Sequence, residues 1–458
     1  MRKVIKTSSS SVIPILLVLL TLCLPFYFRN AFAQQSQQAA DNPGYDKYTR
    51  DLRKGSYTKE KDSFLERAGN MPAVPLELTK KGIEKALIYI EKTHLNDKVQ
   101  YVWGKIHDWG FHPTGQQLHD RPQVGYNILW DRSKLINASP YVEHAGFTAW
   151  NGLNYWGYKE AAGKINLDNI YKTGLYANQE FRYEDRKRED FFGVGHNTSR
   201  GDSYTYRLEA MNYQTRWGRL FHLPWNLGRF NVEGEYRFRD VRISGGRNGA
   251  NHNIRDFFKN DAALAGINGG EYNTIGLNLM HDDRNDVEDP HWGGYRKFTV
   301  LWNKGVNGAD FDFIKYQIDV AQFFPVFKTG NVIGVRYFGE FNNKEDGGTL
   351  PFFEMARLGG WSSLRGFLYN RFFDNNSMFM SFEYRYNVWT FKRFKVDLVP
   401  FLDIGSVFGE SGDFELSNTR FSYGGAGRFM IRDRVNIDLE IGHSDEGTEF
   451  YVKYKAPF

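Results

Sequence analysis

A single charged residue lies in a glycine-broken segment in the last third of the chain. Residues 358–367 read Leu-Gly-Gly-Trp-Ser-Ser-Leu-Arg-Gly-Phe, and Arg365 is the only charge among them. A guanidinium is a planar fork of N–H donors, so its chemistry is the bidentate binding of a carboxylate. Glycines cost backbone entropy and leave gaps in a packed face, so the segment is predicted to be a long structured loop.

A second candidate is an acidic cluster next to His281, whose carboxylates could hold a divalent cation. Its members are Asp282, Asp283, Asp286, Glu288 and Asp289. Their spacing is not that of an EF-hand loop, so the pattern favours a solvated acidic turn and no metal site is predicted.

The sequence contains no motif of a known catalytic site. There is no Gly-x-Ser-x-Gly elbow, no Walker loop and no His-Glu-x-x-His pair. The glycine run at 424–427 falls in an expected strand with no helix after it, which argues against a phosphate-binding loop. We predict no catalytic residue and no cofactor; a lipase site inside the fold is an alternative without support in the sequence.

The N-terminus has the layout of an export signal. Three basic residues in the first six positions precede an apolar run over 12–28, and Ala31-Phe32-Ala33 forms a small-x-small cleavage site. This predicts a signal peptide over 1–33 that is removed, with an uncleaved anchor helix as the alternative. The only cysteine, Cys23, lies within it, so the exported chain would depend on hydrogen bonds and packing and not on disulfides.

The charge balance excludes nucleic acid as a partner. Four of the 59 basic residues and none of the 54 acidic residues lie in 1–33, which leaves the exported chain close to neutral. The mean hydropathy is −0.56, and after residue 33 no apolar run is long enough for a membrane-spanning helix.

The first part of the exported chain, 34–97, contains few apolar residues. Residues 34–72 are predicted to be a polar, flexible linker. From Leu76 to Leu95 apolar residues recur near every 3.6 positions, which predicts one helix. Its apolar face is narrow, so it must rest on a larger structure or plug it.

From about residue 98 the sequence alternates strictly between apolar and polar residues. In 230–239 the apolar residues are even-numbered and the charged ones odd-numbered, and 435–441 shows the opposite parity. Such segments are strands with one apolar and one polar face. Their length, aromatic content and charged polar faces favour an all-β transmembrane antiparallel β-barrel over 98–458 rather than a soluble sandwich, which would have shorter strands.

Fourteen strands can be placed, and 98–110 is a candidate for one more. Single-chain bacterial barrels have even strand numbers, so we expect sixteen with one early strand unplaced. Short connections at 325–330, 391–395 and 432–433 are expected on the periplasmic side, and long ones at 243–271 and 343–376 on the extracellular side. The predicted strands centre on 122–131, 145–158, 165–184, 203–217, 228–242, 272–283, 295–304, 312–324, 331–342, 377–390, 396–407, 420–431, 434–442 and 448–457.

The last strand ends on an aromatic residue. Phe450, Val452 and Tyr454 alternate outward, and the chain finishes at Phe458. This resembles the signal that barrel-assembly machinery reads on its clients; a strand that merely ends on an aromatic is the alternative.

Several segments together resemble a known family, the bacterial surface antigen barrels of the BamA/TamA-like outer-membrane assembly superfamily. The resemblance covers roughly residues 120–458 and implies an outer-membrane location of the Gram-negative type. The segments, in order, are Phe191–Thr198, Asp282–Asn285, Leu358–Phe367, Phe401–Gly405 and Tyr423–Gly427.

In that family the long loop folds into the barrel and its arginine pairs with carboxylates on the next two strands. The resemblance transfers this to Arg365, Gly366 and Phe367 as a loop latch. The alternation agrees, because the apolar residues of 378–388 and 396–404 are even-numbered and place Glu383 and Asp403 in the lumen. The alternative is that both carboxylates are ordinary lumen charges in contact with water.

The chain differs from the larger family members at its N-terminus, since 34–97 offers one helix and no convincing strands for a periplasmic transport-associated (POTRA) domain. We therefore expect a short member without such domains, which helps to insert or translocate protein or lipid. A passive pore or structural barrel is the alternative. The expected partners are outer-membrane lipids, the barrel-assembly machinery during biogenesis and, as a candidate, a periplasmic protein.

Overall fold

The computed structural model describes eleven segments of the chain. They are 111–114, 125–137, 142–154, 158–225, 227–246, 252–255, 264–326, 330–391, 394–410, 412–431 and 435–453. The predicted signal peptide, linker and helix lie outside them. Within these segments no helix is long and apolar enough to cross a membrane.

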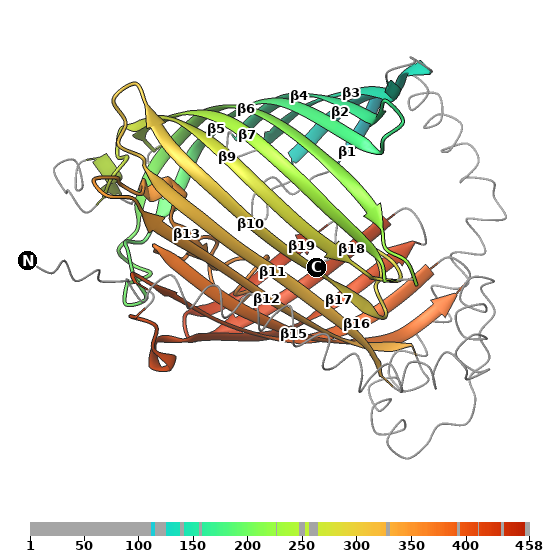
Figure 1. Ribbon diagram of the computed structural model, residues 1–458. Helices are drawn as coiled ribbons and strands as arrows, with labels where there is room; N and C mark the ends of the chain where they lie inside the picture. Colours follow the sequence, from blue (N-terminus) through green and yellow to red (C-terminus); the bar gives the residue numbers. More distant parts are fainter. Residues whose placement is uncertain are drawn as a thin grey trace, which may run out of the picture.

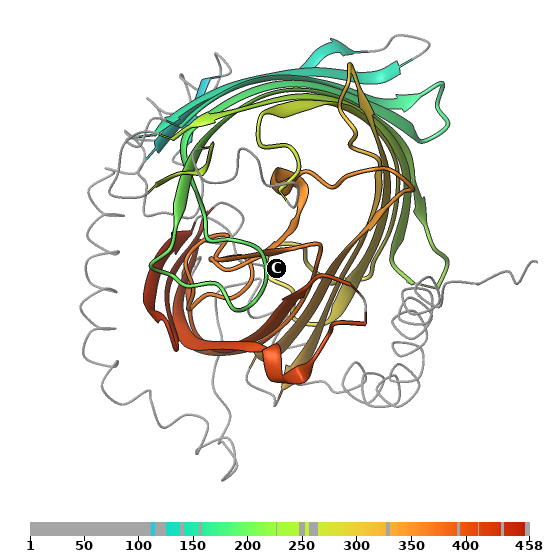
Figure 2. The same cartoon turned by 90° about the vertical axis from the view of Figure 1, so that its left-hand side faces the viewer.

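The described chain is almost entirely β-structure, arranged as one large curled sheet (Figures 1 and 2). The strands of the sheet are β1 (Phe111–Thr114), β2 (Gly125–Asn137), β3 (Val142–Asn154), β4 (Lys159–Ile170), β5 (Leu175–Phe191), β6 (Tyr204–His222), β7 (Arg229–Gly245), β8 (His252–Asn253), β9 (Gly269–Asp282), β10 (Gly293–Val306), β11 (Phe313–Val326), β12 (Asn331–Lys344), β15 (Asn376–Phe391), β16 (Phe394–Phe408), β17 (Arg420–Ile431), β18 (Val435–Ser444) and β19 (Gly447–Lys453).

Each strand of the sheet pairs antiparallel with the next along the chain, except that the short β8 pairs in parallel with β6. Without β8 the 17-stranded sheet has sixteen antiparallel strands, so the expected number is confirmed. In the described segments, no register pair joins β19 to β1 or β2, although these strands end the series.

One predicted strand is wrong. The segment 165–184 is two strands, β4 and β5, joined by a tight turn at 171–174. Asn169, Tyr171 and Lys172 take positive φ angles there, and Gly174 donates its N–H to Asn169 Oδ1 at 2.8 Å. The turn contains no proline and one glycine, so the alternation on either side hid it. The candidate strand at 98–110 lies outside the described segments; β1 follows it.

The sheet is apolar outside and polar inside, as the alternation predicts. Large apolar side chains that face outward are exposed, among them Ile275, Trp302, Phe382, Leu439 and Phe450. The neighbouring polar side chains face the lumen and are buried, among them Glu235, Thr274, Asn278, Glu383 and Glu440. This inversion of a soluble protein's pattern is typical of a barrel that spans a membrane.

The longest connections lie at one end of the barrel and most of the short ones at the other. Which end is extracellular stays a prediction. The connections at 171–174, 327–330, 392–393 and 432–434 are short, whereas those at 192–203, 246–268, 345–375 and 409–419 are long. Some connections are exceptions. The one at 283–292 has ten residues and lies at the short-loop end, whereas those at 307–312 and 445–446 are short and lie at the long-loop end.

The long loops lie across one mouth of the barrel (Figure 2) and build a hydrophobic core there. Phe352 at its centre packs edge-on against Phe191 and Tyr206, with ring centroids 5.6 and 5.1 Å apart. Leu264 and Phe311, from two other connections, belong to the same core. This end of the barrel is therefore filled by packed side chains in addition to the barrel wall.

Candidate functional site

The long connection at 345–375, called the infolded loop below, enters the barrel from the long-loop end (Figure 2). It contains the short 3-10 helix η3 (Phe352–Glu354) and a two-stranded sheet of β13 (Ala356–Leu358) and β14 (Phe372–Asp374). Gly359 and Gly360 begin the tip after β13 with φ angles of 110° and 94°. Residues with a Cβ rarely adopt such angles, so the glycines allow the chain to turn.

The tip places Arg365 against the carboxylates on β15 and β16, with 1% of the residue exposed. Its Nε and Nη2 donate to the two oxygens of Asp403 at 2.9 and 2.7 Å, and Nη1 donates to Glu383 at 2.8 Å. The guanidinium also lies 3.5 Å from the ring centre of Phe401. The donor fork is therefore bound to two carboxylates and covered by an aromatic ring, the arrangement in which charge-assisted hydrogen bonds are strongest.

The charges continue across the last strands. Glu383 also approaches Arg385 and Arg428 at 3.4 and 3.6 Å. Arg428 pairs with Asp438 at 3.1 Å. On the far side Glu440 lies 2.5 Å from Lys453 and 3.7 Å from Arg365. Four cations and four carboxylates are thus buried together on the lumen face of β15–β19, and each charge has a partner of opposite sign.

The backbone of the tip touches the backbone of β18. A Cβ atom placed on Gly442 would lie 2.3 Å from the carbonyl oxygen of Arg365, and one on Gly366 would lie 2.5 Å from His443. Ser444 Oγ donates to the Gly366 carbonyl at 2.7 Å, and Tyr451 donates its hydroxyl to the Phe367 carbonyl at 2.9 Å. The tip therefore contacts β18 and β19 as well as the two strands that carry the carboxylates.

The Phe367 side chain packs into a small apolar cluster beside this network. It meets Phe372 edge-on at 5.2 Å between ring centroids, and neither residue is more than 1% exposed. Leu358, Leu364 and Phe379 complete the contact with β15. The predicted latch residues Arg365, Gly366, Phe367, Glu383 and Asp403 thus lie within one contact region.

A second anchor, Arg371, was not predicted. Its Nε and Nη2 donate to the two oxygens of Glu446 at 2.7 Å each, and its Nη1 donates to Thr198 Oγ1 at 2.7 Å. Arg200 reaches the same β18–β19 turn, donating to the Glu446 carbonyl at 2.7 Å and pairing with Glu449 at 3.2 Å. The infolded loop, the 192–203 loop and the last hairpin are therefore joined at the long-loop end.

A third anchor, Glu354 in η3, was also missed. It pairs with Arg239 on β7, accepts a hydrogen bond from Tyr272 on β9 at 2.6 Å, and lies 3.1 Å from Lys315 on β11. Burial alone would raise the pKa of Glu354, but Lys315 and Arg239 outweigh it and hold that pKa well below its usual range. The loop is thus fixed to the wall opposite Arg365 as well.

The acidic cluster after His281 pairs with cations of the protein. Asp282 binds Arg284 at 2.9 Å, and Asp283 binds Arg296 at 2.7 Å. Asp286 and Glu288 are exposed, as expected of a solvated turn, whereas Asp289 is half-buried and binds Lys395 at 2.7 Å. No group of three or more metal-ligating side chains occurs in the segments that the structure describes.

Part of the predicted C-terminal signal can be placed. Phe450 and Val452 face outward on β19, with exposed fractions of 53% and 47%. Tyr454 and Phe458 lie outside the described segments.

Comparison with known proteins identifies one family model. The model of the Omp85 superfamily domain matches residues 167–430. No protein among those with curated functions matches the chain in sequence.

Among solved structures, the chain is similar to BamA from Haemophilus ducreyi lacking POTRA domains 1–3. The TM-score is 0.53 at 14% identity, covering 74% of this chain and 67% of that one. For CdiB from Escherichia coli the TM-score is 0.49 at 14% identity, with coverage of 75% and 60%. For CdiB from Acinetobacter baumannii it is 0.46 at 11% identity, with coverage of 73% and 56%. At such identities the BamA likeness concerns the fold alone.

Proposed function

This chain belongs to the Omp85 superfamily, and we propose that it helps to insert or translocate protein or lipid at the outer membrane. The chain is an outer-membrane β-barrel, as its superfamily membership shows. What we propose is the process in which the barrel takes part, and this proposal includes no catalytic step.

The observation that carries the proposal is the contact of the Arg365 tip with four of the last five strands. The tip binds β15 and β16 through carboxylates and touches β18 and β19 through backbone and hydroxyl groups. A loop that only narrowed a pore would need no such contact with the strands at the end of the sheet. We therefore propose that Arg365, Gly366, Phe367, Glu383 and Asp403 act as a conformational latch.

The latch would control the edge of the sheet. β19 pairs with β18, and in the described segments no strand pairs with its other edge. An edge strand presents free N–H and C=O groups that can pair with another chain. With the tip in place, β18 and β19 are held against the loop; with the tip displaced, they would be free to move away from β1 and β2.

A passive pore is less well supported. The infolded loop and the hydrophobic core around Phe352 occupy the long-loop mouth, where a pore would need an open, hydrated path. We expect small and irregular currents when the purified barrel is placed in planar bilayers. Large, steady single-channel currents would instead favour the pore.

The latch is tested by Arg365→Ala and Arg365→Lys in cells that lack the native protein. Both variants should lose complementation, measured as outer-membrane permeability to a large antibiotic, because lysine cannot make the bidentate contact. Arg237→Gln is the matched control, since Arg237 is a lumen arginine far from the tip in sequence and pairs with Glu235 at 3.0 Å. Full complementation by Arg365→Ala at normal barrel levels would refute the latch.

Partners are proposed by chemistry only. The exposed apolar belt needs outer-membrane lipid, and outward-facing Phe450 and Val452 support recognition by barrel-assembly machinery during biogenesis. A periplasmic partner is tested by co-purification from outer membranes after mild crosslinking. If only assembly machinery is recovered, the barrel works without a dedicated partner.

A further inference from the structure

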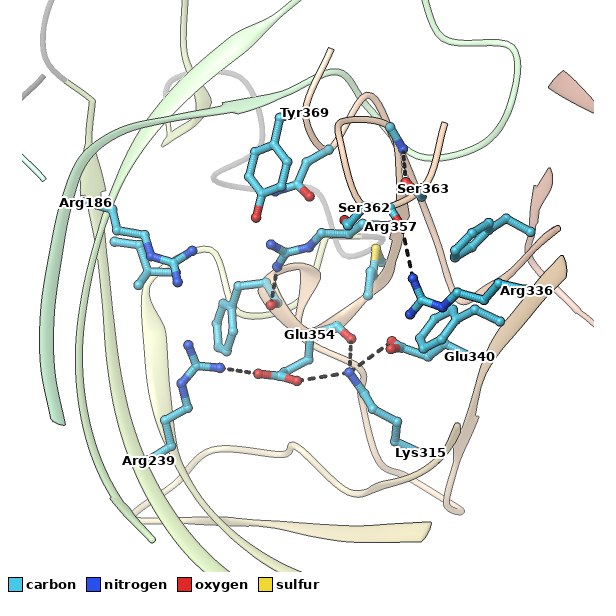
Figure 3. A pocket seen from close by; sticks show the side chains of 17 residues that line it. Arg186, Arg239, Lys315, Arg336, Glu340, Glu354, Arg357, Ser362, Ser363 and Tyr369 are labelled. Carbon is cyan, nitrogen blue, oxygen red and sulfur yellow. Dashed lines mark hydrogen bonds and ion pairs between the residues drawn. The ribbon is translucent and has the colours of Figure 1, made fainter. Parts of the chain in front are cut away.

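A cavity of about 480 Å³ lies between the infolded loop and the barrel wall facing it. Strands β5, β6, β7, β11, β12 and β15 supply one side, and residues 353–370 of the loop supply the other (Figure 3). Its size falls in the range of small-molecule sites, about 300–1,000 Å³.

The floor of the cavity is electrostatically compensated. Lys315 lies between Glu340 at 3.0 Å and Glu354 at 3.1 Å, and Glu354 also pairs with Arg239 (Figure 3). These groups satisfy one another and belong to the anchor of η3, so they leave little charge for a ligand.

The upper part carries an uncompensated positive charge. Five basic and two acidic residues line the cavity; Arg186 and Arg336 find carboxylates outside the lining, in Glu184 and Asp319. Arg357 donates to the backbone carbonyl of Phe353, and within the described segments no carboxylate lies at ion-pair distance from it. In Figure 3 the guanidinium groups of Arg186 and Arg357 lie in the upper part of the cavity, whereas that of Arg239 points toward Glu354.

A second group points independently to a ligand. Asn370 also lines the cavity and is 6% exposed, yet its side-chain nitrogen has no acceptor in the part of the chain that the structure describes. A buried donor without a partner costs about 1–3 kcal/mol, so an acceptor is expected to meet it. Arg357 on β13 and Asn370, two residues before β14, lie at the two ends of the loop tip.

We propose that this cavity binds a phosphate group, with Arg357 as its bidentate partner and Asn370 as a further donor. The guanidinium fork matches the spacing of phosphate oxygens, and the surrounding arginines favour an anion. A compact anion fits better than an extended acidic peptide, because the uncompensated donors belong to one cavity of small-molecule size. Ser362, which lines the cavity and is exposed, gives a route to water.

The phosphate could belong to a lipid headgroup or to a free phosphorylated solute. Two binding experiments distinguish these sources, both with the full barrel in phosphate-free detergent. Isothermal titration with inorganic phosphate and pyrophosphate tests the free solute. Native mass spectrometry with added phosphatidylglycerol, against diacylglycerol as the phosphate-free lipid, tests the headgroup.

Arg357→Gln should weaken the phosphate-dependent binding about tenfold or more, the effect of losing one charged hydrogen bond. Arg237 is a lumen arginine that does not line the cavity, so Arg237→Gln should change the phosphate affinity less than about twofold. Correct folding is checked by the heat-dependent shift of the barrel on gels. If Arg357→Gln does not fold, Ser362→Asp at the exposed rim should weaken binding by placing a negative charge at the entrance.

Saturable binding of inorganic phosphate or pyrophosphate, lost in Arg357→Gln, supports a free solute as the source. Retention of phosphatidylglycerol alone, with the same loss, supports a lipid headgroup. The proposal is overturned if neither binds, if both arginine variants lose binding equally, or if only a glutamate-rich peptide binds. None of these outcomes depends on what the barrel translocates.

Discussion

The two walls of the lumen carry charges in very different states. On β15–β19, which the loop tip covers, the side chains of Glu383, Asp403 and Arg428 are at most 1% exposed. On β5–β7, which the tip does not cover, Arg182 and Arg216 are 38% and 40% exposed. Both walls have similar residue types in similar strands, so the difference comes from the loop. It removes water from one wall and leaves several arginines of the other partly exposed, although carboxylates such as Glu235 are buried there too.

The pairing pattern differs in the same way. On β5–β7 several arginines pair with a carboxylate two positions away on the same strand, as in Arg186–Glu184 and Arg237–Glu235. On β15–β19 most of the pairs join different strands or the loop, with Arg385–Glu383 and Lys395–Asp397 as the same-strand exceptions. Pairs in contact with water contribute about 0–1 kcal/mol, whereas removing one member of a fully buried pair costs about 3–5 kcal/mol, and the pairs of β5–β7 lie between these limits. The covered wall is therefore where substitution should have the greatest effect.

The largest expected effect is that of Arg365→Ala. It leaves Asp403 buried without its cation and removes the nearest cation from Glu383, which keeps only the more distant Arg385 and Arg428. The free energy of unfolding should therefore fall by about 3–5 kcal/mol. Urea unfolding in lipid vesicles, followed by tryptophan fluorescence, measures it. The double variant Arg365→Ala with Asp403→Asn should recover part of the loss, because it removes one uncompensated carboxylate. A fall below about 1 kcal/mol would mean that the covered wall is hydrated after all.

The next effect is steric. Gly442→Ala would place a Cβ 2.3 Å from the Arg365 carbonyl, so the tip must shift and stability should fall by about 1–3 kcal/mol. The matched control is Gly234→Ala on β7, where the nearest atom is 4.0 Å away. Limited proteolysis should cut the infolded loop faster in the first variant only. Equal rates in the two variants would contradict close contact between tip and β18.

Acid should weaken the anchor at η3. The pKa of Glu354 is lower in the folded protein than its ordinary value of 4.5, so its contribution is present above that value and is lost progressively as the pH falls below it. The melting temperature of the barrel should therefore fall between pH 5 and pH 3, and Glu354→Gln should reduce that slope. An unchanged slope in the variant would assign the acid sensitivity to other carboxylates.

The smallest expected effect belongs to the hydrated wall. Arg237→Gln should change the free energy of unfolding by less than about 1 kcal/mol, and added salt should reduce even that. The same urea experiment at low and high salt measures it. A loss as large as that of Arg365→Ala would show that the two walls do not differ in hydration.

The strands and the lumen-facing carboxylates could be predicted because alternation carries the necessary information. The parity of apolar residues around Glu383 and Asp403 is enough to place both in the lumen. The hairpin at 171–174 escaped because Tyr171 and Lys172 adopt left-handed conformations that such residues seldom take, and of the three non-glycine residues there with positive φ angles only Asn169 suggested a turn.

Arg371 and Glu354 could not be predicted for a related reason. Both lie in a loop without periodicity, and their partners belong to distant strands and turns. The sequence contains one indication that the 192–203 loop contacts the infolded loop: Thr198 belongs to Phe191–Thr198, one of the segments that resemble the family. Side-chain orientation in a strand follows from residue number, whereas in a loop it follows from the folded path of the whole chain.

The last hairpin is held unequally along its length. At its turn, Glu446 and Glu449 are bound by Arg371 and Arg200, which come from loops on other parts of the barrel. Along its outer edge, within the described segments, β19 has no backbone partner. If β19 moves outward, its end at the β18–β19 turn would stay in place and its other end would move furthest. The gap would be widest at the short-loop end of the barrel and, under the proposed function, an incoming strand would first pair with β19 there.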